Sequence, residues 1–279
     1  MSPATALITG ASSGIGPELA REFARHEHPL VIVAPNAAEL GELTKRLHAD
    51  FGVPVTPIVA DLTDSSSAEK IFQMIIGSGA RIELLVNNAG LGPRGKFWEG
   101  RLERDLEMIR LNIEAVVRLT KFFLPPMIQR GEGRILNTAL IAGVEPGPLM
   151  AVDQGTRAFL LSWSDAIATE LEAMGVTVTA LCLGPADTDL FPQAELVESA
   201  ALQKTNGLAP QELARVAYAA TMKGERRVIP GGLDGGTIVS RRESVESVQA
   251  KKHEKLYSVV ADHGHEPGGA RAAAASKVR

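Results

Sequence analysis

The eight residues T-G-A-S-S-G-I-G, Thr9 to Gly16, decide the fold class of this chain. They follow a short apolar run that begins at Ala4 and precede a helical pattern. A glycine-rich turn between a buried strand and its helix binds phosphate through backbone N–H groups at the helix N-terminus. In this context Gly10 allows the turn, Gly14 allows a pyrophosphate to approach, and Gly16 allows close packing of helix on strand.

Apolar runs and helical patterns alternate along most of the remaining chain. The predicted strands are Ala4–Thr9, Leu30–Ala34, Val53–Ala60, Ile82–Val86, Gly133–Thr138, Val176–Leu181 and Arg226–Ile229. Amphipathic patterns separate them, including a long one over Leu102–Arg130 that we expect to kink or reset at Pro125 and Pro126. This order predicts an α/β domain over residues 1–236, with a parallel sheet covered on both faces. Residues 237–279 read as a charged helix and a Gly/Ala-rich disordered tail.

The composition is that of an ordinary globular protein. Of 279 residues, 45% are hydrophobic, 22% are charged, and the net charge is -4. This mildly acidic balance does not favour a nucleic-acid partner. Cys182 is the single cysteine, and the histidines lack metal-ligand spacing, so we expect neither a disulfide nor a metal site. No apolar run is long enough to span a bilayer, and no secretion signal is evident, so we expect a cytoplasmic protein.

Several motifs occur in a characteristic order. T-G-A-S-S-G-I-G is followed by N-N-A-G at Asn87–Gly90, then by G-R-I-L-N, P-G-P-L-M-A-V, L-G-P-A-D-T and V-I-P-G. Over residues 4 to about 232, the chain resembles the short-chain dehydrogenase/reductase family. The resemblance implies a Rossmann-type, doubly wound single domain with a mostly parallel seven-stranded sheet, a small-molecule substrate, and a homodimer or homotetramer. It implies nicotinamide dinucleotide contacts at Gly10, Ser12, Ser13, Gly14, Ile15, Gly16, Asn36, Asp61, Leu62, Asn88, Ala89, Gly90, Arg157, Gly184, Pro185 and Thr188.

The residues after the second strand bear on the choice between NAD(H) and NADP(H). A carboxylate there accepts from the ribose 2′-OH of NAD, whereas an arginine pairs with the 2′-phosphate of NADP. This chain has Ala34, Pro35 and Asn36, so both signals are missing. Ser12, Ser13 and Asn36 offer hydrogen bonds to a phosphate, and we favour NADP(H). The same residues leave open that nucleotide binding is weakened or lost.

The resemblance also locates the residues that would carry the chemistry. The family uses Asn, Ser, Tyr and Lys, with Ser thirteen residues before Tyr and Lys four after it. Asn112 keeps the Asn position, but Leu140, Asp153 and Arg157 occupy the Ser, Tyr and Lys positions. Leu140 has no hydrogen-bond donor on its side chain. Arg157 keeps a positive charge, but its guanidinium group does not give up a proton. An ordinary carbonyl reductase would therefore need another acid.

Asp153 is the central question in this set. It donates a proton only if burial raises its pKa, and Arg157 acts in the opposite direction. The alternative is that the two residues form an i,i+4 ion pair in a disused pocket. Four other charged residues lie near the predicted strand ends, and each is either a candidate substrate contact or a solvated loop charge. They are Glu145, Asp187, Arg94 and Lys96. Tyr218 and Tyr257, the only tyrosines, do not lie near this region by pattern.

Three hypotheses follow. The first is an atypical NADPH-dependent reductase of an imine or iminium, which needs no protein acid because Asp153 stabilises the substrate cation. The second is a non-redox lyase, cyclase or isomerase that uses Asp153 as a base and Arg157 as an oxyanion partner. The third is a non-catalytic subunit that pairs with an active paralogue through the helical faces around Leu102–Pro125 and Met150–Met174.

Overall fold

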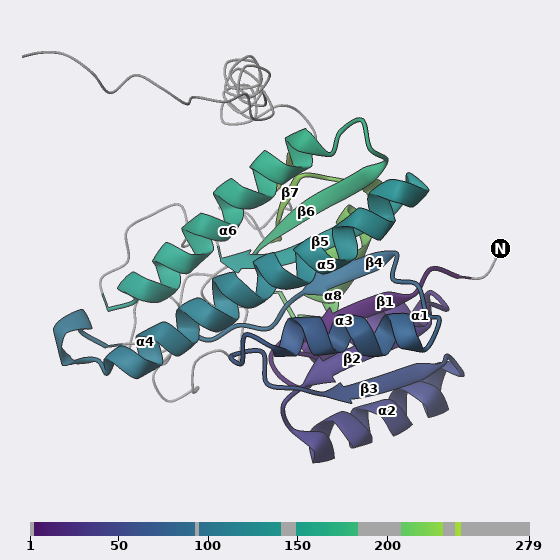
Figure 1. The fold of residues 1–279 in the computed structure, drawn as a ribbon, viewed down its shortest axis with the longest axis horizontal. Coiled ribbons are helices and arrows are strands. Elements are labelled where there is room, and N and C mark those ends of the chain that lie inside the picture. Colours follow the sequence, from purple (N-terminus) through teal and green to yellow (C-terminus); the bar gives the residue numbers. More distant parts are fainter. Residues whose placement is uncertain (1–2, 93–94, 141–148, 184–207, 231–237, 241–279) are drawn as a thin grey trace, which may run out of the picture. The chain divides into compact units, whose positions relative to one another are not determined.

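A computed structural model describes residues 3–92, 95–140, 149–183, 208–230 and 238–240. The chain alternates strands and helices as the sequence predicts (Figure 1). In order, the elements are β1 (Ala6–Thr9), α1 (Gly16–Arg25), β2 (Leu30–Ala34), α2 (Ala37–Phe51), β3 (Val55–Val59), α3 (Ser67–Gly77), β4 (Leu84–Asn87), η1 (Phe97–Glu99), α4 (Leu102–Ile109), η2 (Arg110–Glu114), α5 (Ala115–Arg130), β5 (Gly133–Leu140), α6 (Ala151–Glu170), β6 (Val176–Leu183), α8 (Pro210–Lys223), β7 (Arg227–Ile229) and β8 (Ile238–Ser240).

The sheet has the order β3-β2-β1-β4-β5-β6-β7-β8, and its first seven strands are parallel. The predicted Rossmann-type, doubly wound domain is therefore confirmed. Strand order reverses between β1 and β4, and ligands of such sheets bind beyond the carboxyl ends of the strands at this point. The loops after β1 and β4 carry the Gly-rich turn and the N-N-A-G motif.

Helices cover both faces of the sheet. On one face α1, α2 and α8 pack over a core that includes Leu19, Phe23 and Leu40. On the other face α3, α5 and α6 pack over a second core that includes Leu119 and Phe123 (Figure 1). The strands between them read as near-continuous apolar runs, because a parallel sheet is buried on both sides.

Three features differ from the sequence expectations. The helix α5 continues through Pro125 and Pro126 to Arg130 instead of resetting there. The irregular point of the long pattern is instead η2, a π-helical turn at Arg110–Glu114 that contains Asn112. The strand β8 lies in the segment assigned to the tail and pairs antiparallel with β7. Residues 241–279 lie outside the described residues, so the charged helix and tail there stay predictions.

Candidate active site

The Gly-rich turn has the geometry that a dinucleotide requires. Gly10 and Gly14 adopt φ values of 62° and 56°, which side-chain-bearing residues rarely do. A Cβ at Gly14 would meet no atom within 4 Å, whereas a Cβ at Gly16 would lie 2.0 Å from the carbonyl oxygen of Gly10. No side chain caps α1 at Ile15, and the N–H of Gly16 donates to the carbonyl oxygen of Ser13 at 3.0 Å. The N–H groups of Gly14 and Ile15 make no hydrogen bond among the described residues, so they can donate to a ligand. The turn therefore fits a pyrophosphate, with Ser12 half-buried beside it.

The motif after β4 fastens this turn to the centre of the sheet. Asn88 donates from Nδ2 to the carbonyl oxygens of Thr9 and Gly10, both at 3.2 Å. The backbone N–H groups of Asn88 and Ala89 donate to Oγ1 of Thr9. The asparagine side chain thus has a structural role, and Ala89 lies against Gly10 of the turn, where a Cβ at Gly10 would be 2.7 Å from Cα of Ala89.

Asn36 and Asp61 flank the region that the resemblance assigns to the adenosine end of the cofactor. Oδ1 of Asn36 accepts from the N–H groups of Ala38 and Glu39 and so caps α2. Its Nδ2 makes no hydrogen bond among the described residues. Asp61 is exposed, and its Oδ1 accepts from the backbone and hydroxyl of Thr63, while its Oδ2 has no hydrogen bond among the described residues. Leu62 beside it is buried.

Asp153 and Arg157 form the centre of the candidate site. They lie one turn apart in the first half of α6, and Nε of Arg157 is 3.2 Å from Oδ1 of Asp153. The side chains are 0% and 2% exposed, respectively. Nη1 of Arg157 donates to the carbonyl oxygen of Thr138 in β5 at 3.1 Å. The predicted i,i+4 ion pair is confirmed, and it is buried.

Two polar atoms of this pair lack partners. Oδ2 of Asp153 and Nη2 of Arg157 are buried and make no hydrogen bond within the part of the chain that the structure describes. Such atoms are costly unless a ligand satisfies them. Burial raises the pKa of the Asp153 carboxyl above its usual value, and this effect outweighs the charge and hydrogen bond of Arg157. The pair therefore presents one free acceptor and one free donor.

Glycines make room for both charged groups. A Cβ at Gly90 would lie 2.8 Å from Nη2 of Arg157, and a Cβ at Gly92 would lie 3.2 Å from Oδ1 of Asp153. Sequence reasoning assigned Gly90 to the cofactor and missed Gly92. The available signal was a second glycine two positions after N-N-A-G, because a glycine in such a loop often marks a close approach.

Asn112 supports the same loop. Its Oδ1 accepts from the N–H of Leu91 at 2.9 Å, and its Nδ2 donates to the carbonyl oxygen of Leu91 at 2.8 Å and to Oγ1 of Thr156 at 3.0 Å. Thr156 in turn donates to the backbone oxygen of Asp153. Asn112 thus joins the loop after β4 to the first turns of α6. The sequence did not single out Thr156 or Thr138.

The remaining predicted residues fall into two groups. The backbone of Leu140 ends β5, and its side chain lies outside the described part of the structure. Arg94, Glu145, Gly184, Pro185, Asp187, Thr188 and Tyr257 also lie outside the described residues. Lys96 is paired with Glu99 at 3.0 Å and lies over the ring of Trp98.

Tyr218 is remote from the pair. Its hydroxyl is 3.1 Å from Nε2 of His28, which precedes β2, and its ring stacks on that of His26. This cluster is at the amino ends of the parallel strands, whereas the Gly-rich turn and the N-N-A-G loop are at the carboxyl ends. Tyr218 therefore does not replace the proton donor.

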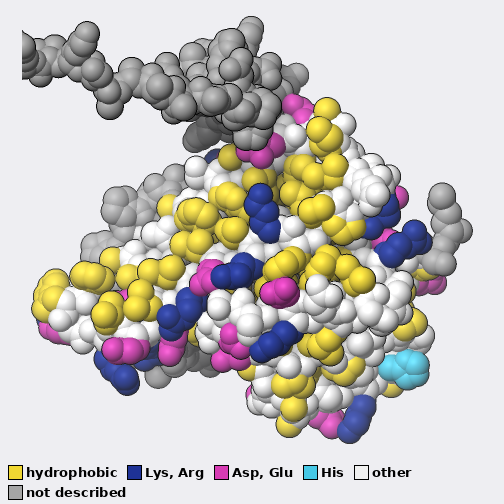
Figure 2. All heavy atoms as spheres, in the orientation of Figure 1, with side chains coloured by type: hydrophobic (Ala, Val, Ile, Leu, Met, Phe, Trp, Pro, Cys, Tyr) yellow, Lys and Arg dark blue, Asp and Glu magenta, His cyan; other side chains and the backbone are white. Residues whose placement is uncertain are grey.

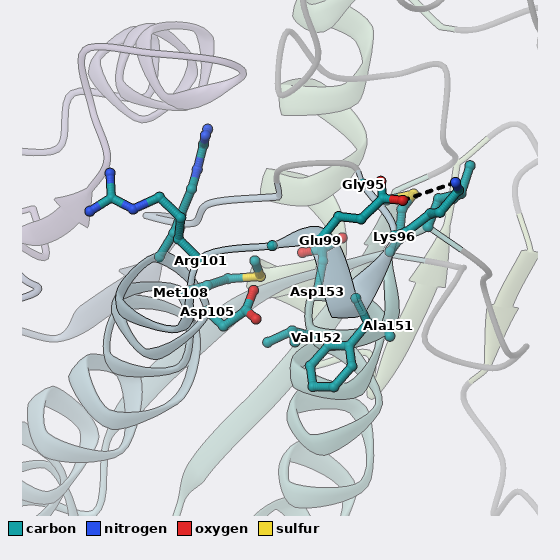
Figure 3. A pocket seen from close by; sticks show the side chains of 14 residues that line it. Gly95, Lys96, Glu99, Arg101, Asp105, Met108, Ala151, Val152 and Asp153 are labelled. Atoms are coloured by element: carbon teal, nitrogen blue, oxygen red, sulfur yellow. Dashed lines mark hydrogen bonds and ion pairs between the residues drawn. The ribbon is translucent and has the colours of Figure 1, made fainter.

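A pocket of about 240 Å³ adjoins the pair. Its walls come from η1, from α4 and from the first turn of α6, and Asp153 lines it (Figure 3). Among the described residues, no cluster of three or more His, Cys, Asp or Glu side chains is arranged to hold a metal ion. Within the same residues, no helix has both the length and the apolar character needed to cross a membrane.

The strand order, the Gly-rich turn and the anchored N-N-A-G loop together define a doubly wound, Rossmann-type α/β protein. A model of the short chain dehydrogenase family matches residues 4–198. The chain belongs to the short-chain dehydrogenase family.

Relatives and solved structures agree with this assignment. An uncharacterized oxidoreductase of Staphylococcus epidermidis is 29% identical over 201 residues, which is 72% of this chain and 86% of that protein. An uncharacterized short-chain type dehydrogenase/reductase of Sinorhizobium fredii is 33% identical and covers 76% of this chain and 82% of its own length.

Two solved structures resemble the chain over most of its length. A short-chain dehydrogenase from Sphingobium yanoikuyae in complex with NADPH has a TM-score of 0.74 at 29% identity, and it covers 96% of this chain and 98% of that chain. An L-sorbose reductase from Gluconobacter frateurii, complexed with NADPH and L-sorbose, has a TM-score of 0.73 at 27% identity, with 85% and 97% covered. The family of this chain and these structural neighbours are thus oxidoreductases.

Proposed function

We propose that this protein is a nicotinamide-dependent reductase whose substrate is an imine or iminium. The observation that carries the proposal is the buried Oδ2 of Asp153, an acceptor that receives no hydrogen bond from the described residues. A substrate with N–H⁺ supplies that donor and the opposite charge, whereas a carbonyl oxygen supplies neither. Burial raises the pKa of Asp153 because it disfavours the charged carboxylate, and a cationic ligand beside Oδ2 would stabilise that charge.

Asp153 and Arg157 have different roles in the proposed reaction. When bound, the reduced nicotinamide supplies the hydride. Oδ2 of Asp153 accepts a hydrogen bond from the substrate nitrogen and stabilises its positive charge. Arg157 holds Oδ1, so the carboxylate keeps its orientation, and its free Nη2 offers a donor for a cofactor hydroxyl. A preformed iminium becomes an amine on receiving hydride, and no protein group has to donate a proton.

The test is NADPH consumption with a panel of cyclic imines. Asp153→Asn keeps an oxygen for Arg157 but removes the charge, so we expect kcat to fall about a hundredfold. Asp50→Asn is the control, because Asp50 is an exposed partner of Arg21 and should leave turnover unchanged. The proposal fails if no imine is consumed, or if Asp153→Asn reduces imines as fast as the parent protein.

A non-redox reaction is the second candidate, and the raised pKa of Asp153 favours it, because a raised pKa makes the carboxylate a stronger base. Arg157 would then stabilise a developing oxyanion through Nη2. Turnover of a substrate without any nicotinamide, lost in Asp153→Asn, would support this candidate over the reductase.

For the cofactor we propose NADP(H) rather than NAD(H). Two structural neighbours were solved with NADPH. Ser12 and Arg46 line one groove beside the Gly-rich turn, and both are able to donate to a phosphate. Glu39 and Glu42 line the same groove and oppose a second negative charge, although Glu42 is paired with Lys45. Titration with NADPH and NADH decides between the two cofactors.

For assembly we propose a homodimer or homotetramer that uses the face of α4, α5 and α6. Figure 2 shows apolar side chains spread over this face. The large exposed ones on these helices are Leu102, Leu106, Ile109, Ile128 and Phe159. Such a surface is typical of an interface. Sedimentation of the purified chain tests the proposal, and recovery only with a homologous subunit would point to a hetero-oligomer with an active paralogue.

A further inference from the structure

The pocket beside Asp153 contains a second carboxylate that the proposed chemistry does not use. Asp105 projects from α4 toward the first turn of α6, where Val152 and Asp153 lie (Figure 3). Asp105 is half-buried, and its carboxylate has no hydrogen bond or ion pair among the described residues. Asp153 is ion-paired through Oδ1, but its buried Oδ2 also has no hydrogen bond among the described residues, so α4 and α6 each contribute an acceptor to this pocket.

Arg157 neutralises the charge of Asp153 from behind the pocket wall, but the positive side chains that line the pocket do not neutralise Asp105. Lys96 is 3.0 Å from Glu99 and pairs with it. Arg101 and Arg104 line the pocket but are exposed, and Arg101 projects away from Asp105 and Asp153 (Figure 3). Solvent screens exposed charges more strongly than half-buried ones. The inner part of the pocket therefore carries one uncompensated negative charge among the described residues, that of Asp105.

Apolar side chains complete the lining. Met108 is buried at the base of the pocket, and Val152 lies opposite on α6. Phe97 and Leu149 also line the pocket, and they are 65% and 53% exposed. Exposed large apolar side chains around a pocket mark a surface for an apolar ligand. A ligand that matches both parts has an apolar body and positive charge.

We infer that Asp105 is a specificity-determining residue that selects substrates carrying a second basic nitrogen, remote from the reacting one, on an apolar body. The inference rests on the proposed function only for the reacting end, which meets Asp153. Asp105 forms the opposite wall, so it binds the second nitrogen as an ammonium group. The favoured class is therefore an amphipathic diamine-type imine.

Binding of saturated amines tests this role without turnover or nucleotide. The probes are a phenylpyrrolidine and its aminomethyl derivative, titrated calorimetrically into the full-length protein at neutral pH. We expect Asp105→Asn to weaken binding of the aminomethyl derivative about tenfold and to change binding of the phenylpyrrolidine less than about twofold. Glu107→Gln is the matched control, because Glu107 is an exposed carboxylate of the same helix and does not line the pocket.

The outcomes separate this inference from the proposed function. Tighter binding of the diamine that depends on Asp105 supports the inference even if no imine is reduced. Equal effects of Asp105→Asn and Glu107→Gln, no effect of Asp105→Asn, or no binding of either amine would overturn it. If Asp105→Asn reduces the diamine-type imine as fast as the parent protein does, the inference about Asp105 is wrong and the reductase proposal is unaffected.

Discussion

Arg157 and Asp153 face each other across one turn of α6, with Nε and Oδ1 3.2 Å apart and both side chains withdrawn from solvent. The pair replaces a phenol and an amine in the pattern that the family resemblance implies. It also leaves one acceptor and one donor without partners. These two atoms connect the fold to the proposed chemistry.

Removing one partner of the buried ion pair should destabilise the protein more than replacing both partners by apolar residues. Arg157→Met leaves an unpaired buried carboxylate, so we expect it to lower the free energy of unfolding by about 3 kcal/mol, whereas the apolar double variant Asp153→Leu/Arg157→Met should lie within about 1 kcal/mol of the parent. Urea denaturation measures both. Arg21→Met, which removes an exposed pair with Asp50, is the control and should cost less than about 1 kcal/mol. A similar loss in Arg157→Met and Arg21→Met would contradict this account of the buried pair.

The glycines of the turn should separate stability from binding. Gly16→Ala places a Cβ 2.0 Å from a backbone oxygen, so we expect a loss of about 3 kcal/mol in unfolding free energy. Gly14→Ala meets open space but a positive φ, so it should cost about 1 kcal/mol while weakening nucleotide binding more than tenfold. Thermal unfolding with and without NADPH reports both effects. Undiminished stabilisation of Gly14→Ala by NADPH would show that the turn does not hold the nucleotide.

Pro35 should limit the affinity for NADPH. It is exposed immediately after β2, at the position where the family resemblance expects an arginine. We expect Pro35→Arg to tighten NADPH binding about tenfold and to leave NADH binding unchanged, because only NADPH carries the 2′-phosphate. Fluorescence titration with both nucleotides measures the ratio. Pro35→Gln has a polar side chain without the charge and should not reproduce the gain.

His28 should make stability depend on pH. A carbonyl oxygen only accepts, so Nδ1 donates to that of Ala4 at 2.7 Å, and in the neutral ring Nε2 accepts from the hydroxyl of Tyr218. Burial lowers the pKa of His28 below its ordinary value of 6.5. The unfolded state then binds more protons below about pH 6.5, so the contribution of His28 is complete above that pH and is lost as the pH falls toward the folded-state pKa.

The measurement is unfolding free energy between about pH 5 and about pH 8 for the parent and for His28→Gln. We expect the unfolding free energy of His28→Gln to fall less steeply with decreasing pH than that of the parent. The charged groups around His28 are His26, Glu22, Glu83 and Arg134. Because they titrate in both proteins, the effect of His28 is the difference in unfolding free energy between parent and variant. Asp153 contributes with the opposite sign, because its pKa is raised and its contribution is lost as pH rises. Identical pH profiles for His28→Gln and its parent would exclude His28 as a source, and exposed His48→Gln serves as the control.

Much of the fold was predictable because its signals are local. The roles of Gly10, Gly14 and Gly16 depend on a turn between one strand and one helix, so eight consecutive residues specify them. The ion pair was predictable for the same reason, since residues four apart in a helix are neighbours. The continuation of α5 through Pro125 and the π-turn around Asn112 were not predictable, because packing of the long helix against the sheet decides them.

The sequence by itself determined the family, the alternation of strands and helices, and the replacement of the proton donor by Asp153. Only the tertiary structure decided the state of that carboxylate. Its burial depends on Gly92, Arg157 and the loop that Asn112 holds, and these residues come from separate segments of the chain. Burial and charge balance are properties of the whole neighbourhood, so spacing along one helix does not determine whether Oδ2 has a partner or whether Asp105 faces the same pocket.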